Sequence, residues 1–91
     1  MNKSKKSFKI ADEVVVSKIN DESVLLNLNT GIYFQVNDLG SFIISELSEF
    51  ISLNSLQNKI MKNFDVTASE CESDLLKFIE ALEEKNLLHF Q

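Results

Sequence analysis

The side chains of this chain that could take part in catalysis are few and lie far apart in the sequence. Cys71 is the only cysteine and His89 the only histidine. A cysteine nucleophile needs a neighbouring base to form its thiolate. Cys71 belongs to a helical stripe of apolar residues, where cysteine behaves as a small hydrophobic side chain. His89 stands in an apolar C-terminal stretch, so the two residues predict no nucleophilic site.

Carboxylates are more numerous, but they are not grouped as metal ligands. Metal sites need Cys, His, Asp or Glu at ligand spacing, and Asp21-Glu22 lies in a stretch that is typical of a turn. The only glycines are Gly31 and Gly40. The chain therefore has no glycine-rich phosphate loop and no Gly-x-Ser-x-Gly motif. We expect no metal, no cofactor and no enzymatic activity.

The composition indicates one small acidic domain. The 91 residues are 44% hydrophobic and 25% charged, with a net charge of −5, which suits a single core. All nine basic residues are lysines. Arginine is the usual residue for bidentate contacts to phosphate and guanine. Its absence from an acidic chain excludes nucleic acid as the expected partner.

The ends and the cysteine content bear on location. A single cysteine cannot form an internal disulfide, which fits a reducing cytoplasm. No stretch approaches the roughly 20 apolar residues that a membrane span requires, so we expect no membrane partner. Four lysines fall within residues 1–9. They predict a basic, frayed tail ahead of a single domain over residues 10–91.

Three segments near the N-terminus have the residue types of β-strands. Residues 14–19 are mostly β-branched, residues 24, 26 and 28 of the apolar run 24–28 would share one face of a strand, and residues 32–36 are mostly aromatic or β-branched. Residues 20–23 and 29–31 are turn sequences, because asparagine and glycine tolerate positive φ. Such short turns predict a three-stranded antiparallel β-meander whose third strand lies at an edge.

The apolar period then changes from two to about 3.6, which indicates helices. Asn37 or Asp38 can cap the first helix and Ser52 or Asn54 the second, and the third begins with a capping box at residues 67–70. The stripe of the third helix consists of Cys71, Leu75, Phe78, Ile79 and Leu82. The expected class is α+β, a three-stranded meander followed by three α-helices.

Three runs within these elements form a recognisable pattern: Val24-Leu25-Leu26-Asn27, Gly31-Ile32-Tyr33-Phe34-Gln35-Val36-Asn37 and Gly40-Ser41-Phe42-Ile43. Their order and spacing resemble the PqqD-like family, with valine at position 36 where leucine is usual. Residues 56–66, 74–82 and 87–88 resemble the family's last two helices and tail. The resemblance covers about three quarters of the chain. It implies a RiPP recognition element: a winged-helix-like domain that captures the leader of a ribosomally made precursor peptide.

The resemblance also implies how the leader binds and who the partners are. In the family the leader lies as an added strand on the third β-strand, in a groove against the third helix. The expected partners are the precursor leader peptide and a processing enzyme, which is a leader peptidase, a cyclase or a radical SAM enzyme. A free-standing chain of this size resembles the separate leader-binding proteins of lasso-peptide pathways. The alternative is a chaperone of the PqqD type, which delivers a precursor to a radical SAM enzyme.

The residues themselves are compatible with this mode of binding. Residues 32–36 include no lysine, proline or acidic residue of the kind that protects an open strand edge, so a partner peptide can add there. On a helical wheel Leu76 lies outside the apolar stripe, on the flank of Glu72 and Glu83. We therefore predict a groove with an apolar pocket formed by Leu76 and Ile79. Its residues are Ile32, Tyr33, Phe34, Gln35, Val36, Glu72, Leu76, Ile79 and Glu83.

Two other functions fit the same elements. A winged-helix DNA-binding protein would use the third helix for recognition. That segment has six acidic residues against two lysines, so DNA phosphates would repel it. A docking subunit without a peptide groove stays open, because the same edge strand could pair with a loop of a larger enzyme.

Overall fold

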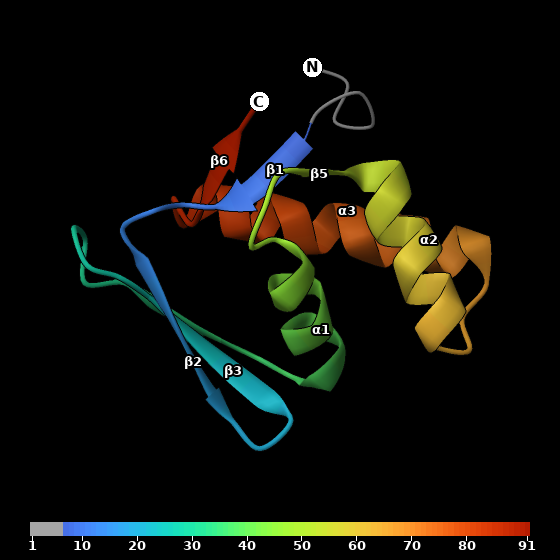
Figure 1. Cartoon of the computed structure of the whole chain (residues 1–91), viewed down its shortest axis with the longest axis horizontal. Coiled ribbons are helices and arrows are strands. Elements are labelled where there is room, and N and C mark those ends of the chain that lie inside the picture. The colour runs from blue at the N-terminus through green and yellow to red at the C-terminus, as the bar shows by residue number, and fades with distance from the viewer. Residues whose placement is uncertain (1–6) are drawn as a thin grey trace.

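The computed structural model describes residues 7–91, which form two small antiparallel sheets and three helices (Figure 1). One sheet has the strand order β5-β1-β6 and the other the order β2-β3-β4. The strands are β1 (Ser7–Ile10), β2 (Val14–Ile19), β3 (Glu22–Asn27), β4 (Tyr33–Val36), β5 (Ile51–Ser52) and β6 (Leu88–Phe90). The helices are α1 (Asp38–Glu46), α2 (Leu53–Asn63) and α3 (Ala68–Glu84). The predicted α+β class, the meander β2-β3-β4 and the three helices are confirmed.

The second sheet was not predicted, and it corrects the expected N-terminal tail. Residues 7–9 belong to β1, which pairs with β5 on one side and with β6 on the other. Phe8 is completely buried, and its ring meets that of Phe90 edge to face at 5.4 Å. Burial of the Phe8 side chain therefore places residues 7–9 in a strand, although the basic residues of this segment predicted a frayed tail. The rest of the predicted tail, residues 1–6, lies outside the described residues.

Each helix begins at one of the residues predicted to cap it. The Asn37 side chain accepts a hydrogen bond from the Gly40 N–H, and Ser52 caps α2 in the same way. Thr67 accepts from the Glu70 N–H and donates to the Glu70 carboxylate, with 2.9 Å between the two oxygens. The first of these bonds is one half of the predicted capping box, and the second joins the two side chains in place of the bond to the Thr67 N–H. Among the described residues, no helix has the length and apolar character needed to cross a membrane.

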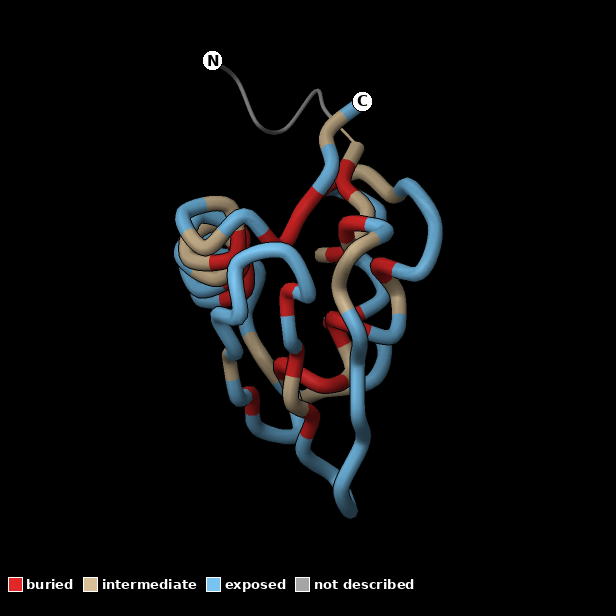
Figure 2. The backbone as a smooth tube through the Cα atoms, turned by 90° about the vertical axis from the view of Figure 1, so that its left-hand side faces the viewer, coloured by how far each residue is buried: buried red, intermediate tan, exposed pale blue. Residues whose placement is uncertain are grey.

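The core lies where the three helices meet the inner face of β2-β3-β4 and the small sheet β5-β1-β6. Figure 2 shows buried backbone segments gathered there, while the tip of the β2–β3 hairpin is exposed. Four residues of the predicted stripe of α3 are buried, namely Cys71, Leu75, Ile79 and Leu82, and the fifth, Phe78, is half-buried. Met61 of α2 is exposed. The stripe of α3 fixes which flank of that helix lies beside β4.

Candidate peptide-binding groove

One edge of β4 has no strand beside it. The Asn27 N–H donates to the Ile32 carbonyl at 2.9 Å, and bonded pairs alternate along an antiparallel ladder. Phe34, two residues after Ile32, therefore turns its main-chain groups toward β3. Tyr33 and Gln35 turn theirs outward, and within residues 7–91 β3 is the only strand paired with β4. The predicted open edge is present.

A flank of α3 forms the wall beside this edge. The ring of Phe34, on the inner face of β4, lies 6.4 Å from the ring of Phe78, measured between centroids. The Lys85 ammonium lies 5.6 Å from the centroid of the Phe34 ring. Both rings are only half-buried, so they form an apolar floor that a bound peptide can cover.

A pocket of about 200 Å³ opens where β4 ends, and it continues this floor. Its base is apolar, and its rim carries one amide and one carboxylate side chain. It is lined by Asn37, Leu39, Gly40, Ile43, Ile60, Val66, Cys71, Asp74, Leu75 and Phe78. We call the open edge of β4, the two phenylalanine rings and this pocket the β4–α3 groove.

Gly40 keeps the pocket open by bringing α1 close to β4. A Cβ atom at this position would lie 2.7 Å from the Cβ of Val36 and 3.3 Å from Cε1 of Phe78. The first distance is shorter than any normal contact between carbon atoms, so only glycine fits without a shift of the backbone. The close packing of α1 against β4 therefore explains why a glycine stands early in α1.

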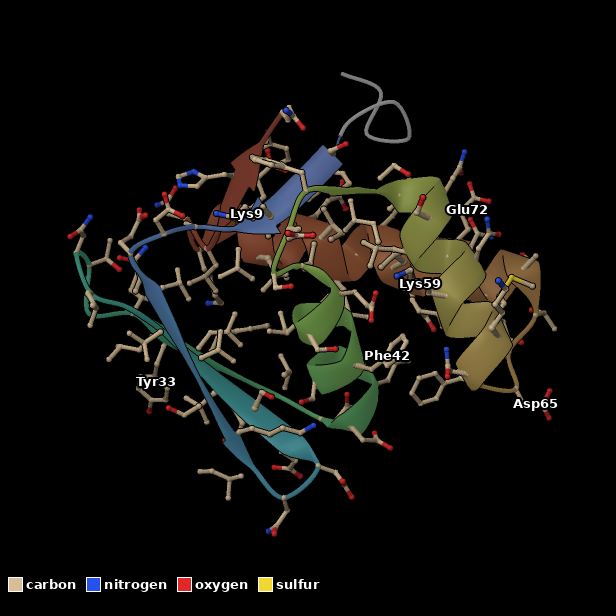
Figure 3. The ribbon with its side chains drawn as sticks, in the orientation of Figure 1. Lys9, Tyr33, Phe42, Lys59, Asp65 and Glu72 are labelled. Carbon is tan, nitrogen blue, oxygen red and sulfur yellow. The ribbon has the colours of Figure 1, made fainter. Side chains whose placement is uncertain are left out.

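The predicted wall lies on the wrong flank of α3. Leu76 is about 160° around the helix from Phe78, and Glu83 and Glu72 are about 140° and 120° from it. Figure 3 shows Glu72 on the opposite side of the molecule from Tyr33. The structure therefore does not bring Glu72, Leu76 and Glu83 to the groove. The residues of α3 that do lie there are Asp74, Phe78 and Lys85.

Ile79 is a second correction, and the predicted residues within 32–36 differ in their exposure. Ile79 is 0% exposed, so it belongs to the core and does not line the groove. Tyr33 and Gln35 are exposed, and Val36 is buried beneath the strand. Ile32 precedes β4 and is exposed. Asp74 lies four residues before Phe78 and Lys85 lies seven residues after it. This helical spacing places all three on one face, so the sequence contained the signal that groups them.

The surroundings of Cys71 and His89 do not favour nucleophilic chemistry. Burial raises the pKa of the Cys71 thiol, and the Asp74 carboxylate adds to the effect. This favours the protonated thiol, which is a weak nucleophile. Nε2 of His89, on β6, accepts a hydrogen bond from the Asp12 N–H at 3.4 Å. No group of His, Cys, Asp and Glu within residues 7–91 has the geometry to hold a metal ion.

Asn27 fixes the position of β4 relative to the end of α3. Its side chain is almost fully buried. Oδ1 accepts from the N–H groups of Asn29 and Thr30, at 2.9 and 3.2 Å, within the turn that leads to β4. Nδ2 donates to the carbonyl of Asn86, just after α3, at 2.9 Å. One side chain therefore joins the two walls of the groove.

Asn27→Ala is expected to lower the free energy of unfolding by about 2–4 kcal/mol, because it removes three hydrogen bonds and leaves buried groups unpaired. Urea unfolding followed by circular dichroism measures the loss. Asn29→Ala is the control, since its exposed side chain lies in the same turn and should change stability by no more than about 0.5 kcal/mol. Equal losses in both variants would contradict the role of Asn27.

The outer face of the β2-β3-β4 sheet carries an exposed apolar row. Val15 lies opposite Leu26, and Leu26 lies opposite Tyr33. These side chains are 45%, 36% and 69% exposed. The row runs across the sheet and ends at β4, so it meets the open edge at Tyr33.

Comparisons with known proteins identify the fold family. The chain resembles TbiB1, whose structure is solved in complex with the TbiA(beta) leader peptide, with 41% identity, a TM-score of 0.83, and 89% of this chain and 94% of that chain covered. A lasso peptide synthetase B1 complexed with the leader peptide has the same fold, with 23% identity, a TM-score of 0.78, and 90% and 96% covered.

The sequence comparison agrees with the structural one. No protein of curated function matches the chain. The family model described as Coenzyme PQQ synthesis protein D (PqqD) matches residues 22–88, which include β3, β4, all three helices and the whole groove. The chain therefore belongs to the PqqD family.

Proposed function

We propose that this chain is a non-catalytic RiPP recognition element. It binds the leader of a ribosomally made precursor peptide as an added strand on β4 and presents it to a processing enzyme. The observation that carries the proposal is the outward-facing main chain of Tyr33 and Gln35 beside an apolar pocket. The complex of the 41% identical TbiB1 with a leader peptide supports it.

Energetics place the decisive contribution in the pocket. About four new main-chain hydrogen bonds contribute roughly 0.5–1.5 kcal/mol each. One apolar leader side chain buried in the pocket adds roughly 1.5–3 kcal/mol. Association and ordering of a flexible leader cost on the order of 4–15 kcal/mol. Main-chain pairing alone is therefore insufficient, and the pocket selects which peptides bind.

The proposal is tested by removing one outward N–H from the edge. Gln35→Pro is expected to weaken binding of the fluorescein-labelled TbiA(beta) leader peptide about 3- to 30-fold, because proline has no N–H to donate to an added strand. An edge position tolerates proline better than a central strand does. Fluorescence anisotropy titration measures the change in Kd.

Gln35→Ala is the matched control, since it keeps the N–H and removes only the exposed side chain that bonds Glu22 at 3.0 Å. It should bind the leader peptide within about twofold of the original chain. Equal affinity of the proline and alanine variants would argue against strand addition, and failure of the original chain to bind any leader would contradict the function.

The processing enzyme is proposed to dock on the outer apolar row. A bound leader would extend the sheet at β4, so this row and the leader would form one continuous surface. Exposed apolar patches on small proteins mark contacts with partners. We favour a leader peptidase of a lasso-type pathway, acting in the cytoplasm. The alternative is delivery to a radical SAM enzyme by the same face.

Tyr33→Lys is expected to separate the two kinds of binding. The leader Kd should change by no more than about twofold, because the main-chain edge remains. Affinity for the proposed leader peptidase should fall about tenfold or more, as for a central aromatic contact. Surface plasmon resonance measures both, with Met61→Lys on α2 as the control. Unchanged peptidase affinity would place the enzyme on another face.

A further inference from the structure

We propose that the β4–α3 groove reads a charge pattern in the leader: a basic side chain beside Asp74, followed about four residues later by an acidic side chain beside Lys85. The inference rests on the proposed addition of the leader to β4. It assigns to this groove a direction and a register, which main-chain hydrogen bonds alone do not specify.

Asp74 supplies the acidic end. Its side chain is exposed at the rim of the pocket, beside Asn37. No salt bridge involves it among residues 7–91. The nearby start of α1 offers it little compensation, because its first amides are already engaged. The Asn37 and Asp38 side chains accept from the N–H groups of Gly40 and Leu39.

Lys85 supplies the basic end. It caps the C-terminus of α3, and its half-buried side chain reaches back over the groove floor, 5.6 Å from the centroid of the Phe34 ring. A cation placed over an aromatic face is held there by the ring's quadrupole. No salt bridge within the described residues involves Lys85. Its charge is therefore available to an acidic side chain that passes above Phe34.

The sheet sets the direction of the pattern. Every pairing within β2-β3-β4 is antiparallel, and purely antiparallel sheets are favoured over mixed ones. The leader would therefore run opposite to β4, which passes from Phe34 near Lys85 toward Asn37 near Asp74. The N-terminal part of the leader then lies at Asp74, so the basic residue comes first.

The helix sets the spacing. Asp74 and Lys85 are separated by about 16 Å along α3, at about 1.5 Å per residue. An extended leader advances about 3.3 Å per residue, and only every second side chain faces the helix. A spacing of four residues covers about 13 Å, and the long lysine side chain spans the remainder.

The test is a selection from a displayed library of random 16-residue peptides, read by sequencing. The original chain should enrich Lys or Arg followed four residues later by Asp or Glu. Asp74→Lys should replace the basic preference by an acidic one, and Lys85→Glu should do the reverse at the second position. For single enriched peptides, each reversal should raise Kd about 3- to 10-fold by anisotropy.

Matched controls keep the net charge equal. Glu72→Lys lies on the far flank of α3, and Lys62→Glu lies on the exposed side of α2, so both should leave the selected pattern unchanged. Thermal melts check that each variant folds. If a charge reversal unfolds the chain, Asp74→Asn or Lys85→Met takes its place, and each should abolish the charge preference at its own end of the groove.

The outcomes separate this inference from the function on which it rests. If the original chain enriches no peptide, leader binding itself is contradicted. If it enriches apolar peptides without a charge preference, or one that Glu72→Lys alters as much as Asp74→Lys, the charge pattern is refuted and strand addition stands. An acidic residue ahead of the basic one would overturn the proposed direction.

Discussion

Phe78→Ala is expected to weaken binding of the TbiA(beta) leader peptide about 10- to 100-fold, the largest effect on affinity among the variants considered. Phe78 lines the pocket and packs against Phe34. Its loss removes the wall that shields a leader side chain from water, at a cost of roughly 1.5–3 kcal/mol. Fluorescence anisotropy titration with the labelled peptide measures the change.

Leu76→Ala is the matched control, because Leu76 is also a half-buried apolar residue of α3 but lies on the other flank. Both variants should lose some stability, as melting curves will show, but only Phe78→Ala should lose leader affinity. If Leu76→Ala weakens binding as much, the flank predicted from the sequence is the correct one and the groove has been placed on the wrong side of α3.

Gly40→Ala is expected to lower the free energy of unfolding by about 1–3 kcal/mol, as overpacking does elsewhere. The added Cβ would lie 2.7 Å from the Cβ of Val36, which is attached directly to the backbone of β4. Relief requires α1 and β4 to separate, and the Phe78 ring to move into the pocket. Leader affinity should fall as well. Urea unfolding and anisotropy measure the two losses.

Gly31→Ala separates backbone strain from crowding. Gly31 has φ of +76°, and a Cβ there would meet no atom within 4 Å. The substitution should cost about 1 kcal/mol of stability, from the left-handed conformation alone, and leave leader affinity unchanged. A loss of affinity in this variant equal to that of Gly40→Ala would show that stability, rather than the pocket, controls binding.

Local sequence signals were sufficient for part of the fold. β2, β3 and β4 are joined by short turns, and each helix has a capping residue at its start, so neighbouring residues specify them. β5 and β6 have two and three residues. They pair with β1 through contacts such as Phe8 with Ile51 and Phe8 with Phe90. Such distant pairings leave no pattern within a local window.

The site divides in the same way. The open edge of β4 could be predicted, because the third strand of a meander is at an edge and residues 32–36 include no protecting charge. The flank of α3 that faces β4 could not be predicted, because an apolar stripe has two flanks and a helical wheel does not show which strand lies beside each. Leu76 was chosen because it is an apolar residue outside the stripe. Phe78, on the stripe, is the residue that reaches β4.

The pairing of β1 with β6 has a practical consequence for handling the protein. Ile10 lies opposite Leu88, and the Gln91 N–H donates to the Ser7 carbonyl at 3.0 Å. The two ends of the described chain, Ser7 and Gln91, thus lie side by side where β1 pairs with β6 (Figure 1). Tethering to a sensor chip, or genetic fusion to a catalytic domain, should therefore approach the molecule from the same side through residue 7 as through residue 91. A short linker joining the two should give a circular permutant that keeps its binding surface.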